Sequence, residues 1–364
     1  MIDYLVVGAG LSGATFAHFA VRAGRRVVVI DRRPHLAGNA FTERIDGIDV
    51  HRYGPHIFHT NDRDVWDFVT SFSPFLPYRH RGRSLAGGRL HPFPINLMTL
   101  HLVFGVTTPA EAEAALAAER VPIANPANLE EYALSQVGER LYRLFLRGYS
   151  MKQWGRDPRE LPVSILKRIP VKLTHDDAWF PDAYQGIPAD GYTAIVERML
   201  DGVPVELGID HHANPGRIRA RKVVYTGPID RFFDHAFGRL EYRSLRFEHR
   251  ALDIPDFQGT AIVNHPDLDV PYTRVVEHKH FTGVAAPRTI VTYEHPVADP
   301  ESREPYYPVN DDRNAALYRR YREAADRRDD TIFLGRLARY AYFDMHQVIG
   351  AAMKAADTEF GLRT

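Results

Sequence analysis

The sequence predicts an α/β fold with a parallel-sheet domain, a helical-bundle insert and an antiparallel-sheet domain. Three observations predict this fold. Residues 1–31 read as strand, glycine-rich turn, helix and strand. Residues 95–157 carry apolar side chains at helical spacing, whereas short stretches of residues 239–296 alternate apolar and polar side chains as strands do. The chain has 364 residues, which is long enough for more than one hydrophobic core.

The first elements form a βαβ unit. A β-branched strand from Tyr4 to Val7 leads into the turn Gly-Ala-Gly-Leu-Ser-Gly, a helix over 14–23 and a second strand that ends in an acid. The first glycine permits the tight turn, the second lets a pyrophosphate approach the backbone, and the third lets helix and strand pack closely. The acid can accept hydrogen bonds from a ribose. The predicted dinucleotide-binding residues are Gly8, Gly10, Ser12, Gly13, Asp31 and Arg32.

Two further segments favour FAD over NAD as the dinucleotide. Gly38 and Asn39 extend the first nucleotide contact. Near the C-terminus, the strand Thr331–Gly335 leads through a loop into a helix over Met345–Ala356, with Asp344 as a good N-cap. FAD proteins commonly carry such a return beside the first strand, where the helix N-terminus stabilises a reduced flavin. An ordinary helix tied to the core is the alternative. We predict a discontinuous Rossmann-like FAD-binding domain over 1–76, 185–238 and 325–364.

The middle of the chain supplies the other two domains. The capping box Thr108-Pro109-Ala110-Glu111 starts a helix that runs to about residue 119, and another helix starts at Asn128. We therefore predict a helical domain over 95–157. The alternating runs at 243–247 and 289–293 predict an antiparallel sheet, and 314–325 reads as a helix. We assign 77–94, 158–184 and 239–324 to this sheet domain.

Composition excludes several functional classes. The chain has 46 basic and 46 acidic residues, so it lacks the bulk positive charge that nucleic-acid binding uses. It has no cysteine, which excludes thiolate nucleophiles and Cys-ligated metals. The N-terminus has no basic region, and no apolar run reaches the roughly 20 residues of a membrane span. We expect a soluble, cytoplasmic protein without nucleic-acid or membrane partners.

Three kinds of residue could carry chemistry. His51, His56 and His59 could bind a metal, but their spacing lacks a known metal motif, and a loop against a flavin is the interpretation we favour; we predict no metal. Residues 145–155 hold aromatic side chains that suit stacking on a base or sugar, although helix core competes for Phe145. Arginines recur beside tyrosines, as a diphosphate ligand requires, although any single arginine could form a surface ion pair.

Read in order, these segments resemble bacterial UDP-galactopyranose mutases over residues 1 to 356. The matching motifs are the opening glycine turn, Gly54-Pro55-His56-Ile57-Phe58-His59-Thr60, Tyr149 through Gly155, Gln185-Gly186-Ile187-Pro188, Pro271-Tyr272-Thr273-Arg274 with Glu277-His278-Lys279, Glu304-Pro305-Tyr306-Tyr307-Pro308, and Gly335 through Gln347.

The resemblance implies roles for several of the matching residues. Arg168, Arg274 and His59 are implied as catalytic, with both arginines on the diphosphate. Substrate contacts are implied for Phe145, Tyr149, Trp154, Trp179, Tyr184, Asn264, Tyr307 and Tyr342. The flavin would also be held by His56, Gly335, Arg336, Asp344 and Met345.

The implied reaction interconverts UDP-galactopyranose and UDP-galactofuranose without net redox change. Reduced FAD would attack the anomeric carbon through N5, form a covalent flavin–sugar intermediate and displace UDP. The resemblance also implies a homodimer, with UDP-galactose as substrate and an external electron donor, such as NAD(P)H, that reduces the flavin. A flavin amine oxidase and a non-catalytic nucleotide-binding module are the alternatives.

Overall fold

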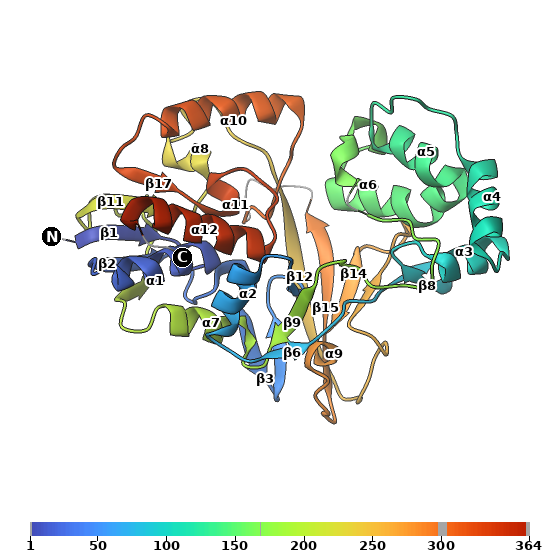
Figure 1. Cartoon of the computed structure of the whole chain (residues 1–364), viewed down its shortest axis with the longest axis horizontal. Helices are drawn as coiled ribbons and strands as arrows, with labels where there is room; N and C mark the ends of the chain where they lie inside the picture. Colours follow the sequence, from blue (N-terminus) through green and yellow to red (C-terminus); the bar gives the residue numbers. More distant parts are fainter. Residues whose placement is uncertain (1, 168, 298–303, 362–364) are drawn as a thin grey trace. The chain divides into compact units, whose positions relative to one another are not determined.

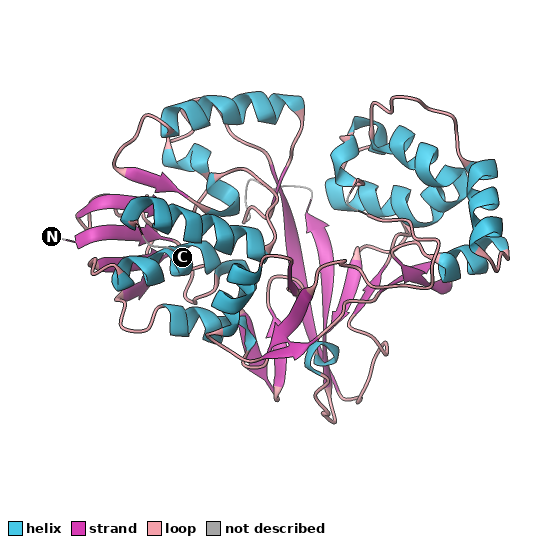
Figure 2. Cartoon of the chain, viewed as in Figure 1, coloured by secondary structure: helices cyan, strands magenta, loops and turns pink. Residues whose placement is uncertain are grey.

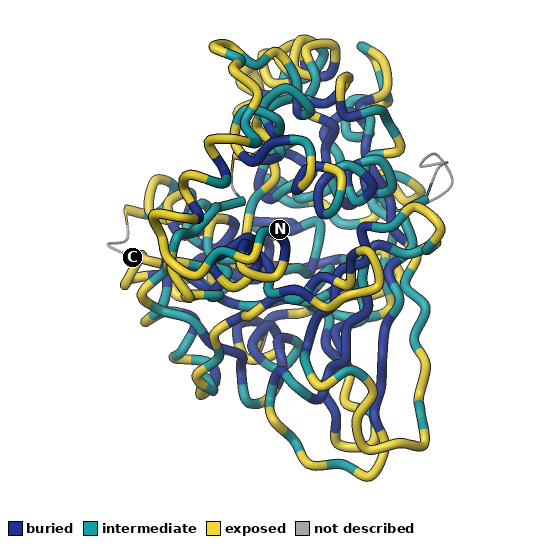
Figure 3. Tube along the Cα trace, turned by 90° about the vertical axis from the view of Figure 1, so that its right-hand side faces the viewer, coloured by how far each residue is buried: buried dark blue, intermediate teal, exposed yellow. Residues whose placement is uncertain are grey.

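The chain forms two compact units in a computed structural model that describes residues 2–167, 169–297 and 304–361. The first unit comprises Met1–Tyr78, Asp182–Tyr242 and Pro305–Thr364, and the second comprises Arg79–Pro181 and Arg243–Glu304. In Figure 3 the buried residues run through the interior and the exposed residues gather in loops and on outer helix faces. Within the described ranges, no helix combines the length and apolar character that crossing a bilayer requires.

A parallel sheet forms the centre of the first unit, in the strand order β10-β2-β1-β11-β17 (Figure 1). Every neighbouring pair is parallel, as predicted for a Rossmann-like fold. The C-terminal strand pairs with β11, so segments from both ends of the chain share one sheet. The strands are β1 (Ile2–Val7), β2 (Val27–Asp31), β10 (Val205–Leu207), β11 (Ala220–Tyr225) and β17 (Thr331–Phe333).

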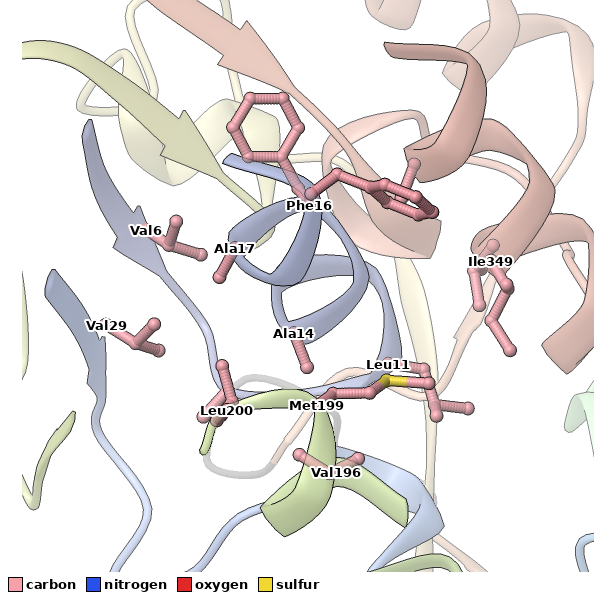
Figure 4. Close-up of a cluster of buried hydrophobic side chains, with 14 of the residues drawn as sticks. Val6, Leu11, Ala14, Phe16, Ala17, Val29, Val196, Met199, Leu200 and Ile349 are labelled. Atoms are coloured by element: carbon pink, nitrogen blue, oxygen red, sulfur yellow. The ribbon is translucent and has the colours of Figure 1, made fainter. Parts of the chain in front are cut away.

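Three helices cover this sheet and enclose its core. Helix α1 (Leu11–Arg22) follows β1, α7 (Gly191–Met199) lies against it, and α12 (Met345–Phe360) packs along it. Figure 4 shows Val6 and Val29 from the strands, with Ala14 from α1 and Ile349 from α12. All four side chains are fully buried. Removing this apolar area from water contributes roughly 25 cal/mol per Å² to folding.

The remaining elements of the first unit are short. Strands β3 and β4 form one antiparallel pair, and β5, β9 and β6 form a second small sheet. Residues 336–343 were expected as a loop but begin with a short helix, α11. The bounds are β3 (Thr42–Ile45), β4 (Ile48–His51), β5 (Phe58–Thr60), α2 (Arg63–Thr70), β6 (Phe75–Pro77), β9 (Tyr184–Pro188), α8 (Ile229–Phe232), β16 (Tyr307–Pro308), α10 (Asp312–Ala325) and α11 (Gly335–Ala338).

The position of α10 differs from the predicted domain boundary. Residues 305–324 were assigned to the sheet domain, but they lie in the first unit. The physical reason is packing, because Tyr321 of α10 is buried in one apolar cluster with Ile229, Leu240 and Tyr340. The division of the second unit into a helical and a sheet domain stays a prediction.

Helices gather in one part of the second unit (Figure 2). They are α3 (Leu97–Phe104), α4 (Pro109–Glu119), α5 (Leu129–Leu141) and α6 (Gly148–Trp154). The predicted capping box is present, because Thr108 accepts a hydrogen bond from the Glu111 amide and Glu111 accepts one from the Thr108 amide. A π-helical turn over Tyr142–Arg147 joins α5 to α6. Such turns are frequent at functional sites, and this one contains Phe145.

The sheet of the second unit has the strand order β12-β15-β14-β13-β7-β8. All neighbours are antiparallel except β13 and β7, which are parallel. The strands are β7 (Gly82–Ala86), β8 (Arg89–Phe93), β12 (Tyr242–Leu252), β13 (Ile262–Asn264), β14 (Arg274–Glu277) and β15 (Thr289–Val297); a short helix, α9 (Lys279–Thr282), follows β14. The predicted antiparallel sheet is confirmed, with strands longer than the runs that predicted it.

Candidate active site

The glycine-rich turn after β1 leaves no room for side chains at two positions. Gly8 has φ +115°, and a Cβ there would lie 1.9 Å from Thr226 Oγ1. A Cβ on Gly13 would lie 2.0 Å from the Gly8 carbonyl oxygen. At Gly10 the nearest atom to an added Cβ is Gly38 Cα at 3.7 Å, so the protein itself leaves space there. The turn therefore has a bare backbone at the N-terminus of α1, where a pyrophosphate can be bound.

Asp31, at the end of β2, is held by backbone amides. Its carboxylate accepts hydrogen bonds from Ala9 N at 2.7 Å and from Arg33 N at 2.8 Å. Arg32 is exposed, whereas Arg33 donates to Asn39 Oδ1 at 2.9 Å and lies 4.3 Å from the centre of the Tyr53 ring. Arg33, which the sequence argument did not select, is thus the arginine that is fixed beside Asp31.

The C-terminal return lies beside the glycine-rich turn, as predicted. Gly335 has φ +81°, and a Cβ there would lie 3.4 Å from Ser12 Oγ and 3.6 Å from Thr226 Cβ. The Ser12 hydroxyl in turn lies 3.4 Å from the carbonyl oxygen of Val348, in α12. The first and last segments of the chain therefore meet at one end of the parallel sheet.

Arg336 and two tyrosines form a cluster on this return. Tyr307 and Tyr342 stack with ring centroids 5.4 Å apart and an interplanar angle of 17°. The guanidinium carbon of Arg336 lies 5.5 and 5.3 Å from the two ring centres, and its Nη2 donates to the Tyr306 carbonyl oxygen at 2.6 Å. Its Nε is buried without a partner in the described residues, so a hydrogen-bond donor remains for a ligand.

His59 lies between two carboxylates. Its Nδ1 is 2.7 Å from Asp182 Oδ2, and its Nε2 is 4.0 Å from Asp344 Oδ2. Asp344 precedes α12, and its amide donates to Gln347 Oε1 at 2.9 Å. The ring of His346 is 5.1 Å from that of His59, and burial is the main cause that lowers the pKa of His346. Asp182 orients the His59 ring. The two residues are far apart in the sequence, so their contact could be found only from the folded structure.

The geometry does not support a metal site at His51, His56 and His59. His51 Nδ1 accepts a hydrogen bond from the His56 amide at 3.0 Å, and His56 Nδ1 donates to the Gly54 carbonyl oxygen at 2.8 Å. Burial lowers the pKa of His51 to about 3. Among the described residues, the groups compact enough to share an ion are His59 with Asp344 and His346, and Asp256 with Glu277 and His280; neither includes His51 or His56.

Two other residues selected in the first unit have different surroundings. Tyr184, on β9, stacks on Trp66 with ring centroids 5.5 Å apart and an interplanar angle of 20°. Met345, the first residue of α12, is partly buried against the main core. Tyr184 therefore does not join the stacked pair of Tyr307 and Tyr342.

The aromatic residues of the second unit divide between core and partly exposed positions. Phe145 is only 3% exposed, with ring centroids 5.1 Å from His91 and 5.9 Å from Phe93. It belongs to the hydrophobic core, which was the alternative to stacking on a base or sugar. Trp179 is partly exposed and lies 5.6 Å from Phe93. Two more partly exposed rings belong to α6, those of Tyr149 and Trp154.

Arg274 is oriented by a buried carboxylate. Its Nε donates to Glu294 Oε2 at 2.6 Å, and the two residues are register partners on β14 and β15. Glu294 is fully buried, and burial raises its pKa. Asn264 is the register partner of Arg274 on β13, and its Nδ2 donates to the Arg83 carbonyl oxygen at 3.2 Å. Arg168 lies outside the described residues.

Together, the fold and these clusters define the chain as a dinucleotide-binding protein of the Rossmann-like class. The sequence profile of NAD(P)-binding Rossmann-like domains matches residues 6–72. A crystal structure of reduced UDP-galactopyranose mutase has a similar fold, with a TM-score of 0.77 over 99% of this chain and 94% of that one at 16% identity.

The sequence comparisons identify the family. The UDP-galactopyranose mutase profile matches residues 144–342. The chain is 39% identical to a probable UDP-galactopyranose mutase of Klebsiella pneumoniae, over 98% of this chain and 94% of that protein. It is 38% identical to a dTDP-fucopyranose mutase of Escherichia coli, over 98% of each chain. The chain belongs to the UDP-galactopyranose mutase family, whose members are isomerases, which confirms the resemblance seen in the sequence.

Proposed function

We propose that the protein interconverts the pyranose and furanose forms of UDP-galactose with the help of bound FAD and without net redox change. One observation carries this proposal. The segment Gly335–Arg336 lies against Ser12 of the glycine-rich turn and presents Arg336 with the stacked Tyr307 and Tyr342. A dinucleotide site and a set of donors suited to phosphate or sugar oxygens are therefore adjacent within one unit.

The residues of the first unit fit FAD. The bare backbone at Gly8, Gly10 and Gly13 would hold the pyrophosphate, together with Ser12. Asp31 with Arg33 and Asn39 would hold the adenosine end. The buried, unpartnered Nε of Arg336 is a donor that a bound flavin or phosphate would satisfy. Asp344, Met345 and the N-terminus of α12 would face the ring. When bound and reduced, FAD would supply its N5 as the nucleophile toward the anomeric carbon of the sugar.

The chain's own side chains would bind and stabilise the leaving nucleotide. Arg274, held by Glu294, would pair with the diphosphate, and Arg168 would do the same. Asn264, Tyr149 and Trp154 would bind the nucleoside and sugar, with Trp179 and Tyr184 as further contacts. Phe145 would contribute one edge from the core. His59, oriented by Asp182, would hold a proton at Nε2 beside Asp344.

One comparison favours a second candidate substrate. The Escherichia coli relative, 38% identical over its length, is named for dTDP-fucopyranose. The same chemistry on a dTDP-linked 6-deoxyhexose is therefore the alternative within this reaction class. We further propose a homodimer and an external electron donor for the flavin. A flavin amine oxidase activity would differ, because it consumes an electron acceptor in each turnover.

Direct turnover tests the proposal. The purified protein is incubated with UDP-galactofuranose or dTDP-fucofuranose, with and without dithionite, and the pyranose product is separated by chromatography. We expect conversion of UDP-galactofuranose only after reduction, with no electron acceptor consumed in proportion to product. Faster conversion of the dTDP-sugar would select the second candidate. Absence of conversion with both sugars, in protein that binds FAD, would contradict the proposed function.

A further inference from the structure

Lys152, on α6, has an ammonium group surrounded by backbone oxygens. Its Nζ donates to the carbonyl oxygens of His265, Asp267, Val270 and Tyr272, at 2.6, 2.8, 3.0 and 2.9 Å. All four oxygens belong to one loop, residues 265–272. An ammonium has three N–H donors, so with four carbonyl acceptors within hydrogen-bond distance every one of its donors has a partner.

This loop connects two residues of the candidate site. It joins β13, which ends at Asn264, to β14, which begins at Arg274, and these two residues are register partners. A second contact anchors the loop to the same helix. A Cβ on Gly148, the first residue of α6, would lie 2.2 Å from the Pro266 carbonyl oxygen, so loop and helix meet there without an intervening side chain.

We propose that Lys152 is a positioning residue, whose ammonium fastens loop 265–272 to α6 and so sets the spacing between Arg274 and Asn264 on one side and Tyr149 and Trp154 on the other. The inference rests on the proposed function, in which these residues bind the nucleotide-sugar. No residue role assigned from the sequence included Lys152, although it lies inside the Tyr149–Gly155 motif.

Two acidic residues that act on Lys152 lie on the loop it binds. Asp267 and Asp269 favour its charged form, but burial is the larger effect and lowers the pKa of Lys152 to about 8. Burial and the Lys152 charge lower the pKa of His265 to about 4, and burial raises the pKa of Tyr272. Because burial opposes the charged form, charge alone does not hold the loop on α6; the hydrogen bonds to the four carbonyl oxygens do.

The test compares Lys152→Met with Lys279→Met in the FAD-loaded enzyme. Lys279 is a matched control because its ammonium also donates to backbone oxygens, those of Pro255 and Ala286, and it lies beyond the far end of β14. UDP affinity is measured by calorimetry, and amide hydrogen exchange of residues 265–272 is followed by mass spectrometry. We expect Lys152→Met to weaken UDP binding about tenfold, with faster exchange in the loop, and Lys279→Met to change UDP affinity less than about twofold.

A second variant keeps the inference testable if Lys152→Met folds poorly. Addition of propylammonium to Lys152→Ala is expected to restore UDP binding and slow loop exchange. Unchanged affinity and exchange in a folded Lys152→Met protein, or a Lys152→Ala protein that propylammonium does not rescue, would overturn the inference. Wild-type protein that converts neither sugar would instead refute the proposed function. The exchange measurement would still show whether Lys152 holds loop 265–272 on α6.

Discussion

At the scale of single residues, the arrangement of Arg274 and Glu294 explains how a cation can be presented to a diphosphate. The carboxylate engages Nε, which fixes the plane of the guanidinium. Removing one partner of a buried pair leaves the other charge without compensation, which costs about 3 kcal/mol or more. We expect Glu294→Ala to lower the free energy of unfolding by about this amount and to weaken UDP binding. Urea denaturation and calorimetry measure both, and Glu294→Gln, which keeps an acceptor, should lose less of each.

Substitution of Arg274 and Arg168 tests whether these two arginines bind the diphosphate. Arg274→Ala and Arg168→Ala should each lower kcat/KM by an amount equivalent to about 2–5 kcal/mol of transition-state stabilisation, because each removes a charge from a desolvated pair. Steady-state kinetics with UDP-galactofuranose give these values. Arg250→Ala, which removes an exposed arginine paired with Glu248, is the control and should leave kcat/KM near that of wild type. Near-normal turnover in both test variants would remove the diphosphate assignment.

His51 makes the stability of the first unit depend on pH. Its Nδ1 accepts a hydrogen bond, so the folded state needs the neutral ring, and its pKa falls from 6.5 to about 3. The stability that this group contributes is complete above pH 6.5 and is lost as the pH falls toward 3, at up to about 1.4 kcal/mol for each pH unit. Denaturation curves at several pH values measure the loss. His51→Asn keeps an acceptor that does not titrate, so an equally steep loss in that variant would contradict the assignment.

At the scale of elements, different glycines of the glycine-rich turn are needed for folding and for ligand binding. Gly13→Ala would place a methyl group 2.0 Å from the Gly8 carbonyl oxygen, so we expect lower thermal stability and loss of FAD. Gly10→Ala meets its nearest protein atom at 3.7 Å, so we expect a stable protein that loses FAD because the methyl group occupies the approach of the pyrophosphate. Differential scanning fluorimetry and flavin absorbance distinguish the two results. Gly10→Ala protein that retains FAD would place the pyrophosphate elsewhere.

Elements with strong local signals could be predicted from the sequence. The βαβ opening, the helix capped by Thr108 and the final helix all follow from capping and periodicity. Residues 336–338 were expected as loop but form α11, and the π-helical turn before α6 was not expected. Neither has a local sequence signal, because each depends on tertiary packing around it.

At the scale of the whole molecule, the class of fold could be predicted, but several partners within the site could not. Gly8, Gly13 and Gly335 were predictable because backbone geometry requires glycine there. Asp182 and Glu294 were missed because each acts on a residue 20 or more positions away in the sequence. Arg32 was predicted in place of Arg33 because the sequence does not show in which direction each of two adjacent arginine side chains points.

The interleaving of the first unit has a consequence for biosynthesis. Its sheet needs β17 and its core needs α12, and both follow the opening strand β1 by more than 300 residues. Until α12 emerges from the ribosome, one side of α1 stays uncovered, and its apolar surface is a target for chaperones. The first unit can therefore complete its core only after the second unit has been synthesised.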